Sequence, residues 1–283
     1  MYHQFFGFKE PPFNLTPNSK YFFDSAKHTE ALSTLLYAIN ERKGFCVVTG
    51  NIGSGKTTVC RKLINQLDAN TQTALITNTH LSAKDLLTSI MDDLEIEYDR
   101  GSKSRLHAQL NEYLINQLMK NNNVVLIIDE AQNLTPSVLE EVRMLSNLET
   151  ENEKLLQIVF LGQPELKQKL AMPKLEQLRQ RIAVYFHLTP LSEEDTRNYI
   201  LHRLHVASDN GKNIFTEDAI MAVYKFSNGV PRLINQICDS SLLSAYIYEK
   251  KQVDLRIVQE AIGESPVTVI CDTKVKYKEG VNA

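Results

Sequence analysis

The 283-residue sequence predicts an α/β fold in which a parallel five-stranded sheet is flanked by helices and followed by a small all-helical region. From Phe45 to Leu188, short apolar runs alternate with stretches of helical periodicity, a pattern typical of a parallel sheet covered on both faces. Beyond Pro190 the apolar runs stop and only helical periodicity continues. The chain is therefore expected to form one larger and one smaller domain.

The expected elements follow this order along the chain. Residues 1–26 are rich in aromatic side chains and carry Pro11, Pro12 and Pro17, so they are interpreted as an extended lead segment that must pack on another part. A helix is expected over 26–41, and strands near 45–49, 74–77, 124–128, 157–161 and 184–188. Helices are expected near 56–67 and 82–94, then, after a polar loop at 99–104, up to about Lys120, and near 136–148. Two short helices are expected after the fourth strand, and further helices near 192–207, 216–227, 231–249 and 254–262. The stretch from Ser265 to Ala283 is interpreted as a tail, with an added edge strand as the less favoured alternative.

Composition and charge exclude several classes of protein. No apolar stretch approaches the roughly eighteen residues that span a bilayer, and the N-terminus lacks a signal-peptide pattern, so a soluble cytoplasmic protein is expected. The formal charge of −3 gives no general electrostatic case for nucleic-acid binding, although a local basic face is left open. His202 and His205 are expected on a solvated helix face rather than in a metal site. The four cysteines are widely scattered along the chain, which predicts reduced thiols rather than disulfides or a zinc site; they are Cys46, Cys60, Cys238 and Cys271.

Residues 50–57, Gly-Asn-Ile-Gly-Ser-Gly-Lys-Thr, match the phosphate-binding pattern GxxxxGK[ST] between an apolar run and a helical stretch. Its glycines would let the backbone curl so that N–H groups point at phosphate oxygens beside a helix N-terminus. Lys56 is then expected to reach the β- and γ-phosphates of a nucleoside triphosphate, and the Thr57 hydroxyl to ligate Mg²⁺. A glycine-rich turn that binds nothing is the alternative. The expected nucleotide-binding residues of this loop are Gly50, Asn51, Ile52, Gly53, Ser54, Gly55, Lys56, Thr57 and Thr58.

A second signal lies where the apolar run 124–128 leads directly into Asp129 and Glu130. Such a run predicts a strand buried on both faces of a parallel sheet. Because open α/β sheets bind ligands at the C-terminal edge, both carboxylates are expected to face the same nucleotide, from a strand neighbouring the first. Asp129 suits Mg²⁺ and Glu130 suits polarising the attacking water, whereas the alternative is a pair that starts a loop and caps the next helix.

Several stretches resemble those of AAA+ ATPases, and more narrowly the ExeA/GspA group (general secretion pathway protein A), which includes short MshM-like pilus-biogenesis ATPases. The similarity covers roughly residues 1–263. The matching stretches are 5–8, 12–13, 15–17, 28–32, 43–45, 128–132, 145–150, 161–166, 178–182 and 229–235.

The resemblance implies an AAA+ P-loop NTPase core followed by a helical lid. It implies an aromatic N-terminal segment and helix packing on the core at 1–41, the ATPase α/β domain at 42–190, the lid at 191–263 and a tail at 264–283. Longer members of the group carry a membrane-spanning segment and a peptidoglycan-binding region after the ATPase. Neither is seen in this sequence, so a short cytoplasmic ATPase, peripheral to the inner membrane at most, is the closer comparison.

The resemblance also implies roles for residues outside the two motifs. Gln163 is similar to the polar sensor of the γ-phosphate, a position at which many relatives have Asn. Arg181, with Arg179 as the alternative, resembles the arginine finger that reaches a neighbouring subunit's nucleotide. Arg232 matches the second sensor, which contacts nucleotide within its own subunit, and His28 lies where similar proteins line the adenine pocket. The structural alternatives are surface salt bridges for the arginines and helix-start packing for His28.

These observations together predict an ATPase that uses ATP and Mg²⁺ and forms a homo-oligomer, either ring or filament, in which nucleotide state controls assembly. The favoured output is an assembly or motor factor for a bacterial envelope machine, such as type II secretion or a type IV pilus, acting through a membrane-machine protein partner. The alternative is an ATP-dependent DNA-binding regulator of transposition that acts in target selection. A nucleotide-gated binding module with negligible hydrolysis is disfavoured by Glu130.

Overall fold

The computed structural model describes residues 2–16, 18–99, 101–151, 153–208, 214–265 and 268. These residues form two compact units. Unit 1 contains the described residues of Met1–Ser25, Gly53–Gly55 and Pro190–Ala283, and unit 2 contains those of Ala26–Ile52 and Lys56–Thr189. Cys271 and most of the expected tail at 264–283 lie outside the described residues.

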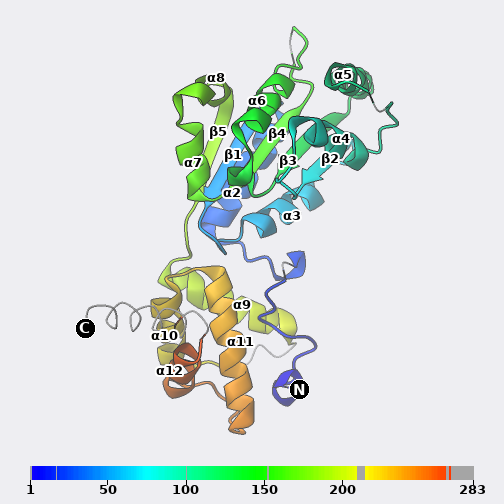
Figure 1. Ribbon diagram of the computed structural model, residues 1–283. Coiled ribbons are helices and arrows are strands. Elements are labelled where there is room, and N and C mark those ends of the chain that lie inside the picture. Colours follow the sequence, from blue (N-terminus) through cyan, green and yellow to red (C-terminus); the bar gives the residue numbers. More distant parts are fainter. Residues whose placement is uncertain are drawn as a thin grey trace, which may run out of the picture. The chain divides into compact units, whose positions relative to one another are not determined.

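Unit 2 is built on a sheet of five parallel strands (Figure 1). The strands stand in the order β2-β3-β4-β1-β5, which confirms the predicted parallel five-stranded sheet. Their bounds are β1 (Phe45–Gly50), β2 (Thr71–Ile76), β3 (Asn123–Ile128), β4 (Gln157–Gly162) and β5 (Ile182–Leu188).

The expectation that the acidic strand neighbours the first strand is wrong, because β4 lies between β1 and β3. The burial pattern explains this order. All residues of β1 and β4 are buried, whereas alternate residues of β2 and β5 are more exposed. Fully apolar strands are stable where both faces and both edges are covered, so β1, β3 and β4 occupy the interior and β2 and β5 the edges.

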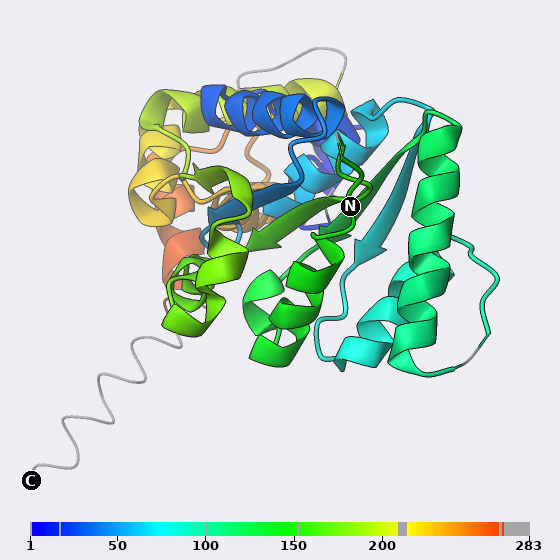
Figure 2. The same cartoon turned by 90° about the horizontal axis from the view of Figure 1, so that it is seen from above.

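Helices cover both faces of this sheet. On one face lie α2 (Ala26–Asn40) and α3 (Lys56–Gln66). On the other lie α4 (Ala83–Asp93), α5 (Lys103–Met119), α6 (Pro136–Leu145) and α7 (Pro164–Leu170), followed by α8 (Glu176–Arg179). Figure 2 shows α2, in blue, on one side of the sheet and α5 and α6, in green, on the other. Two short 3₁₀ turns complete the unit, η2 (Ala131–Asn133) and η3 (Pro173–Leu175).

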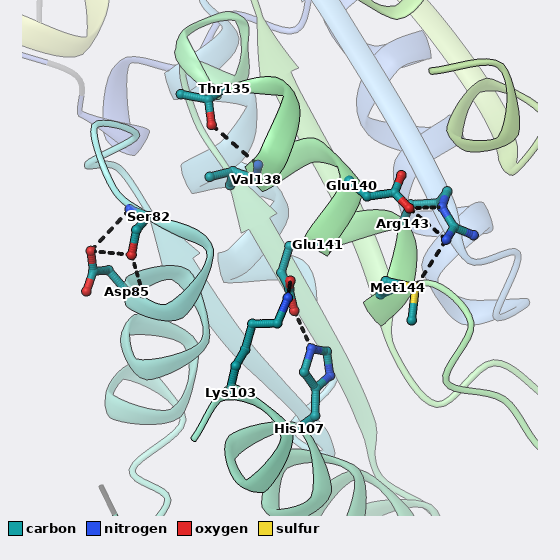
Figure 3. Close-up of polar contacts among 10 residues, drawn as sticks. All are labelled: Ser82, Asp85, Lys103, His107, Thr135, Val138, Glu140, Glu141, Arg143 and Met144. Atoms are coloured by element: carbon teal, nitrogen blue, oxygen red, sulfur yellow. Dashed lines mark hydrogen bonds and ion pairs between the residues drawn. The ribbon is translucent and has the colours of Figure 1, made fainter. Parts of the chain in front are cut away.

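Side chains at the helix starts explain several of these boundaries. Ser82 caps α4 through the backbone N–H of Asp85, whose carboxylate accepts the N–H of Ser82 in return, forming a capping box (Figure 3). Thr135 accepts from the N–H of Val138 at the start of α6, where Pro136 occupies the first helical position. These contacts satisfy backbone donors that a helix start leaves unpaired.

A buried carboxylate joins α5 to α6 (Figure 3). The Glu141 side chain is only 2% exposed, and its Oε2 accepts a hydrogen bond of 2.7 Å from Lys103 Nζ. Its Oε1 contacts His107 Nε2, one turn further along α5. A carboxylate removed from water is costly unless it is paired, so these two partners account for its place in the interior.

Unit 1 consists of helices and the N-terminal segment. Its helices are α1 (Tyr2–Phe6), α9 (Glu193–Ala207), α10 (Glu217–Ser227), α11 (Pro231–Ile247) and α12 (Leu255–Gly263), with the 3₁₀ turn η1 (Ser19–Tyr21). This confirms the predicted helical region. Within its core, the side chains of Phe6, Phe8, Phe13 and Tyr21 pack against those of α9–α12. The segment expected as one piece at 1–41 is thus divided, because its aromatic part belongs to unit 1 and α2 to unit 2.

Arg203 on α9 fixes the aromatic segment within unit 1. The residue is 6% exposed, and its guanidinium donates to Pro12 O at 2.6 Å, to Tyr199 Oη at 2.8 Å and to Asn14 O at 3.3 Å. It also lies over the Tyr21 ring, 4.7 Å from the centroid. A buried guanidinium is stabilised by such carbonyl acceptors and aromatic faces.

The expected solvated face at His202 and His205 is found only in part. His205 is exposed, but the His202 ring is partly buried and lies 5.8 Å from the Phe23 ring, because the aromatic segment covers that side of α9. Across the described residues, no group of three or more His, Cys, Asp or Glu side chains could hold a metal ion.

The three cysteines in the described residues are unpaired. Cys46, Cys60 and Cys238 are free and buried, and burial raises the pKa of the Cys46 and Cys60 thiols to about 12.

Every helix in the described residues is too short or too polar to traverse a bilayer.

Candidate functional site

The glycine-rich loop leaves β1 at Gly50 and enters α3 at Lys56. Gly53 and Gly55 have φ angles of 77° and 97°, in the left-handed region that favours glycine. Gly50 ends β1 without a positive φ, so two of the three glycines provide the predicted curl. The loop therefore has the strand-turn-helix form in which free N–H groups at a helix start can bind phosphate.

The Lys56 ammonium contacts the backbone at the start of this loop. It is 6% exposed and donates to Gly50 O at 2.8 Å and to Asn51 O at 3.0 Å. Burial lowers the pKa of Lys56, while the nearby charges of Glu130 and Asp129 oppose that shift. Two backbone carbonyls are weak partners for a buried cation, so phosphate oxygens could displace them at little cost.

Asp129 brings the acidic strand end to the start of α3. Thr57 Oγ1 donates to Asp129 Oδ2 at 3.0 Å, and Asp129 Oδ1 accepts the Glu130 N–H at 2.9 Å. A hydroxyl and a carboxylate at this separation present two hard oxygen ligands side by side. Mg²⁺ usually takes only one or two protein oxygens and completes its shell with water and substrate phosphates, so Thr57 and Asp129 fit this ion.

Glu130, the second residue after β3, occupies an unusual backbone position. Its φ of 53° is in the left-handed region, which is strained for a residue with a side chain. Burial raises its pKa, but hydrogen bonds from the Gln132 and Gln163 side chains and the charge of Lys56 outweigh burial and leave the pKa below its usual value. Glu130 is therefore an ionised carboxylate that faces the same region as Lys56.

Gln163 follows β4 and reaches Glu130 from the neighbouring strand. Its Nε2 donates to Glu130 Oε2 at 3.1 Å. Because β4 lies between β1 and β3, its C-terminal end places Gln163 between the phosphate loop and the acidic strand end. The structure thus brings together Lys56 and Thr57 from the start of α3, Asp129 and Glu130 from the end of β3, and Gln163 from the end of β4.

Two predicted arginines make contacts within their own chain. Arg181 Nη1 donates to Ser146 O at 3.3 Å, at the end of α6. Arg179 Nη1 donates to Leu170 O at 3.4 Å and to Ala171 O at 3.3 Å, at the end of α7. Both cations satisfy carbonyls that a helix end leaves unpaired, and neither forms a salt bridge with another of the described residues.

The remaining predicted residues lie as follows. His28 is buried in the first turn of α2, in unit 2. Arg232 lies in the first turn of α11, in unit 1, and its role as second sensor stays a prediction. Asn51 and Ile52 are exposed in the loop, and Thr58 is partly buried in α3.

Two residues at the site, Gln132 and Lys169, belong to neither sequence motif. Gln132 lies within the stretch 128–132 that carries the resemblance, two residues after Glu130, so its proximity to the site could have been noticed. Lys169 on α7 donates to Gln132 O and, at 2.9 Å, to Leu134 O. No pattern distinguishes this lysine from the exposed Lys167 on the same helix.

Comparison with known families and sequences adds independent information. Residues 39–170 match the family model described as AAA domain. The chain is 46% identical over 247 residues to general secretion pathway protein A of Aeromonas hydrophila, an alignment that covers 87% of this chain and 45% of the relative. The chain thus spans about half the length of the curated relatives it matches.

Solved structures show the same fold at low sequence identity. The ORC2 protein of Aeropyrum pernix superposes with a TM-score of 0.67 at 14% identity, covering 88% of this chain and 72% of that one. The RuvB Holliday junction branch migration motor of Thermotoga maritima gives 0.60 at 17% identity, with the same shares covered.

Proposed function

Since this chain belongs to the AAA+ ATPases, in the group of general secretion pathway protein A, we propose that it is a Mg²⁺-dependent ATPase whose nucleotide state controls its assembly. The observation that carries the proposal is the 3.0 Å hydrogen bond between the Thr57 hydroxyl and the Asp129 carboxylate. It joins two motifs 72 residues apart in the chain, and each motif alone predicts one half of a nucleotide site.

Each residue of the site has a task that its surroundings support. Glu130 orients and polarises the attacking water, for which an ionised carboxylate with a lowered pKa is suited. Lys56 offsets the negative charge that develops on the transferred phosphoryl group. Thr57 and Asp129 would hold Mg²⁺, which supplies further charge neutralisation at the phosphates when bound. Gln163 reports on the γ-phosphate through its side-chain amide.

The direct test is the Glu130→Gln variant, which keeps the shape of the side chain and removes its charge. We expect ATP binding to be retained, turnover to fall by about 10²- to 10⁴-fold, and an ATP-bound oligomer to accumulate. Turnover is measured by phosphate release and assembly by light scattering, with and without a Mg²⁺ chelator. Glu112→Gln, at an exposed position of α5, is the charge-matched control. Unchanged turnover in Glu130→Gln would remove this residue from catalysis.

The assembly part of the proposal depends on an arginine supplied by a second copy. A finger of this kind contributes about 10³- to 10⁵-fold where it acts, so turnover per subunit should rise with protein concentration. Arg181 and Arg179 are the candidates, and either would have to leave the helix-end carbonyls it now contacts.

Mixing of variants separates these two arginines. Subunits carrying Arg181→Ala keep an intact Glu130, and subunits carrying Glu130→Gln keep an intact Arg181. If Arg181 acts between subunits, the mixture regains part of the turnover that both variants lack alone. The same experiment with Arg179→Ala should give no regain, because that variant alone should remain active. The opposite result would assign the finger to Arg179.

We further propose that the ATPase serves a bacterial secretion or type IV pilus-like envelope machine, through a protein partner at the inner membrane. Support comes from the relative named general secretion pathway protein A. The rings of Phe6, Phe8, Phe13 and Tyr21 are buried in the core of unit 1, so these four rings are not available to a partner. In a host lacking the gene, secretion or piliation should be restored by the natural chain and not by Glu130→Gln. Turnover stimulated by duplex DNA at low salt would favour the transposition alternative instead.

A further inference from the structure

Gln132 uses both ends of its side-chain amide to join two residues of the site. Its Oε1 accepts the backbone N–H of Gln163 at 3.0 Å, and its Nε2 donates to Glu130 Oε2. One side chain thus connects Glu130, two residues after the end of β3, to Gln163, directly after β4. An amide whose donor and acceptor are both engaged is fixed in orientation, because rotation would break both bonds.

The surrounding chain leaves room for this amide and for little else. A Cβ atom at Gly162 would lie 3.1 Å from Gln132 Oε1 and 2.7 Å from Leu166 Cδ2. A larger residue at the end of β4 would therefore clash with Leu166 and press against the Gln132 amide oxygen. Glycine at this position is explained by the close approach of the Leu166 and Gln132 side chains.

The backbone of Gln132 is also held in place. Lys169 donates to the carbonyl oxygens of Gln132 and Leu134, which ties η2 to α7. Gln163 is the N-cap residue of the same helix. Both ends of the contact between Gln132 and Gln163 are therefore attached to α7, and the strained turn at Glu130 is anchored from one side.

Both amide donors reach the same oxygen of Glu130. Gln132 and Gln163 each donate to Oε2, and among the described residues no side chain donates to Oε1. Two donors on one oxygen set the rotation of the carboxylate and leave the other oxygen to accept a proton. If the Gln163 amide turns toward a phosphate, only the Gln132 amide keeps Glu130 in this orientation.

We propose that Gln132 is a positioning residue that holds the Glu130 carboxylate through its Nε2 and the Gln163 backbone through its Oε1. It keeps Glu130 Oε1 directed at the attacking water while Gln163 reads the nucleotide. This inference rests on the proposed ATPase function, within which it assigns a residue that neither motif includes.

Two substitutions separate the contacts of Gln132. Gln132→Met keeps the length of the side chain and removes both contacts. Gln132→Glu keeps an acceptor for the Gln163 N–H but places a second negative charge against Glu130. We expect kcat to fall about 10- to 100-fold in Gln132→Met and at least as far in Gln132→Glu, with KM and the Kd for ATP, measured by fluorescent-nucleotide titration, within about 3-fold of the natural protein.

A readout independent of turnover is the hydrogen exchange of the Gln163 amide. Its N–H donates to Gln132 Oε1, so it should exchange faster in Gln132→Met and stay protected in Gln132→Glu. Gln168→Met, at an exposed position of α7, is the matched control and should change neither exchange nor kcat.

The outcomes distinguish this inference from the proposed function. A natural protein without ATP turnover would overturn the proposed function, whereas the exchange of the Gln163 amide would still report on the contact. A natural protein that is active, with Gln132→Met equally active, would overturn the inference. A matching loss of nucleotide affinity in Gln132→Met would also overturn it, because it would indicate a general structural role.

Discussion

The C-terminal end of the sheet in unit 2 and the core of unit 1 each hold a charged side chain, partly buried in the first and buried in the second, in two different ways. Glu130 sits in a strained left-handed turn, and its partners are the side-chain amides of Gln132 and Gln163, for which we propose further roles in the site. Arg203 sits in the middle of a regular helix, and its guanidinium is surrounded by carbonyls, a hydroxyl and aromatic rings that belong permanently to the fold.

The difference indicates which charge serves chemistry and which serves stability. Partners that a ligand can replace leave the charged group free to interact with that ligand. The backbone strain at Glu130 persists because the surrounding structure enforces that conformation. A charged group whose hydrogen bonds are all made within the fold, as for Arg203, has no donor left for a ligand. Substitutions at Glu130 and its neighbours should therefore alter turnover with little effect on stability, and substitutions at Arg203 should do the reverse.

The largest expected effect is at the phosphate loop. Lys56→Ala should lower turnover by about 10²- to 10³-fold, because a preorganised donor at the developing charge is lost. It should also remove the stabilisation by ATP, which for the natural chain is about 2.7 kcal/mol at 100 times Kd. Unfolding of the nucleotide-free protein should hardly change, because the ammonium has only two carbonyl partners. Thermal unfolding with and without ATP measures both effects.

The next effect tests the opposite end of the comparison. Arg203→Met should lower the free energy of unfolding of unit 1 by about 2 to 4 kcal/mol, since it leaves the carbonyls of Pro12 and Asn14 without a donor. Hydrogen exchange should increase in residues 2–16 and in α9, with the sheet of unit 2 unaffected. The control is Arg256→Met, at an exposed position of α12. Equal losses in the two variants would contradict a structural role for Arg203.

A smaller effect is expected at Glu141, which resembles Arg203 in being paired within the fold. Glu141→Gln should lower the stability of unit 2 by about 1 to 2 kcal/mol, because a neutral amide is a poorer partner for Lys103 and His107. Its neighbour Glu140 is 52% exposed and pairs with Arg143, so Glu140→Gln should cost less than about 0.5 kcal/mol. Urea unfolding of the two variants measures the difference. Turnover should be the same in both.

The smallest effect is a pH dependence in unit 1. Burial, with the positive charges of Arg203 and His205, lowers the pKa of His202 below its usual value, against the opposing influence of Asp24 and the Phe22 backbone. A lowered pKa in the folded state means that stability is full above the unfolded value of about 6.5 and is lost as the pH falls through the folded value. Unfolding measured from pH 7.5 to 5 should show this loss. His202→Asn should reduce the slope most, and His205→Asn should reduce it less, because it removes only one of the causes that lower the pKa of His202.

The sheet, its helices and the meeting of the two motifs could be predicted from the sequence, because each depends on local patterns. Apolar runs such as 124–128 identify buried strands, and the end of such a strand identifies the ligand edge of the sheet. Strand order could not be derived in this way. That β4 separates β1 from β3 depends on which buried faces pack best among all five strands.

The residues that support the site were not predictable for a related reason. Gln132 and Lys169 act through contacts across strand ends and helices, and no spacing along the chain encodes those contacts. Arg203 shows the same limit, because its acceptors at Pro12 and Asn14 lie some 190 residues earlier in the sequence. The capping roles of Arg179 and Arg181 became visible only once the ends of α6 and α7 were placed.

The assignment of the first 25 residues to the helical unit has a mechanical consequence. Apart from the short loop Gly53–Gly55, the polypeptide passes between the units twice, at Ser25–Ala26 and at Thr189–Pro190. A fragment that starts at Pro190 would lack the rings that complete its interior and should aggregate unless residues 2–25 are supplied as a separate peptide.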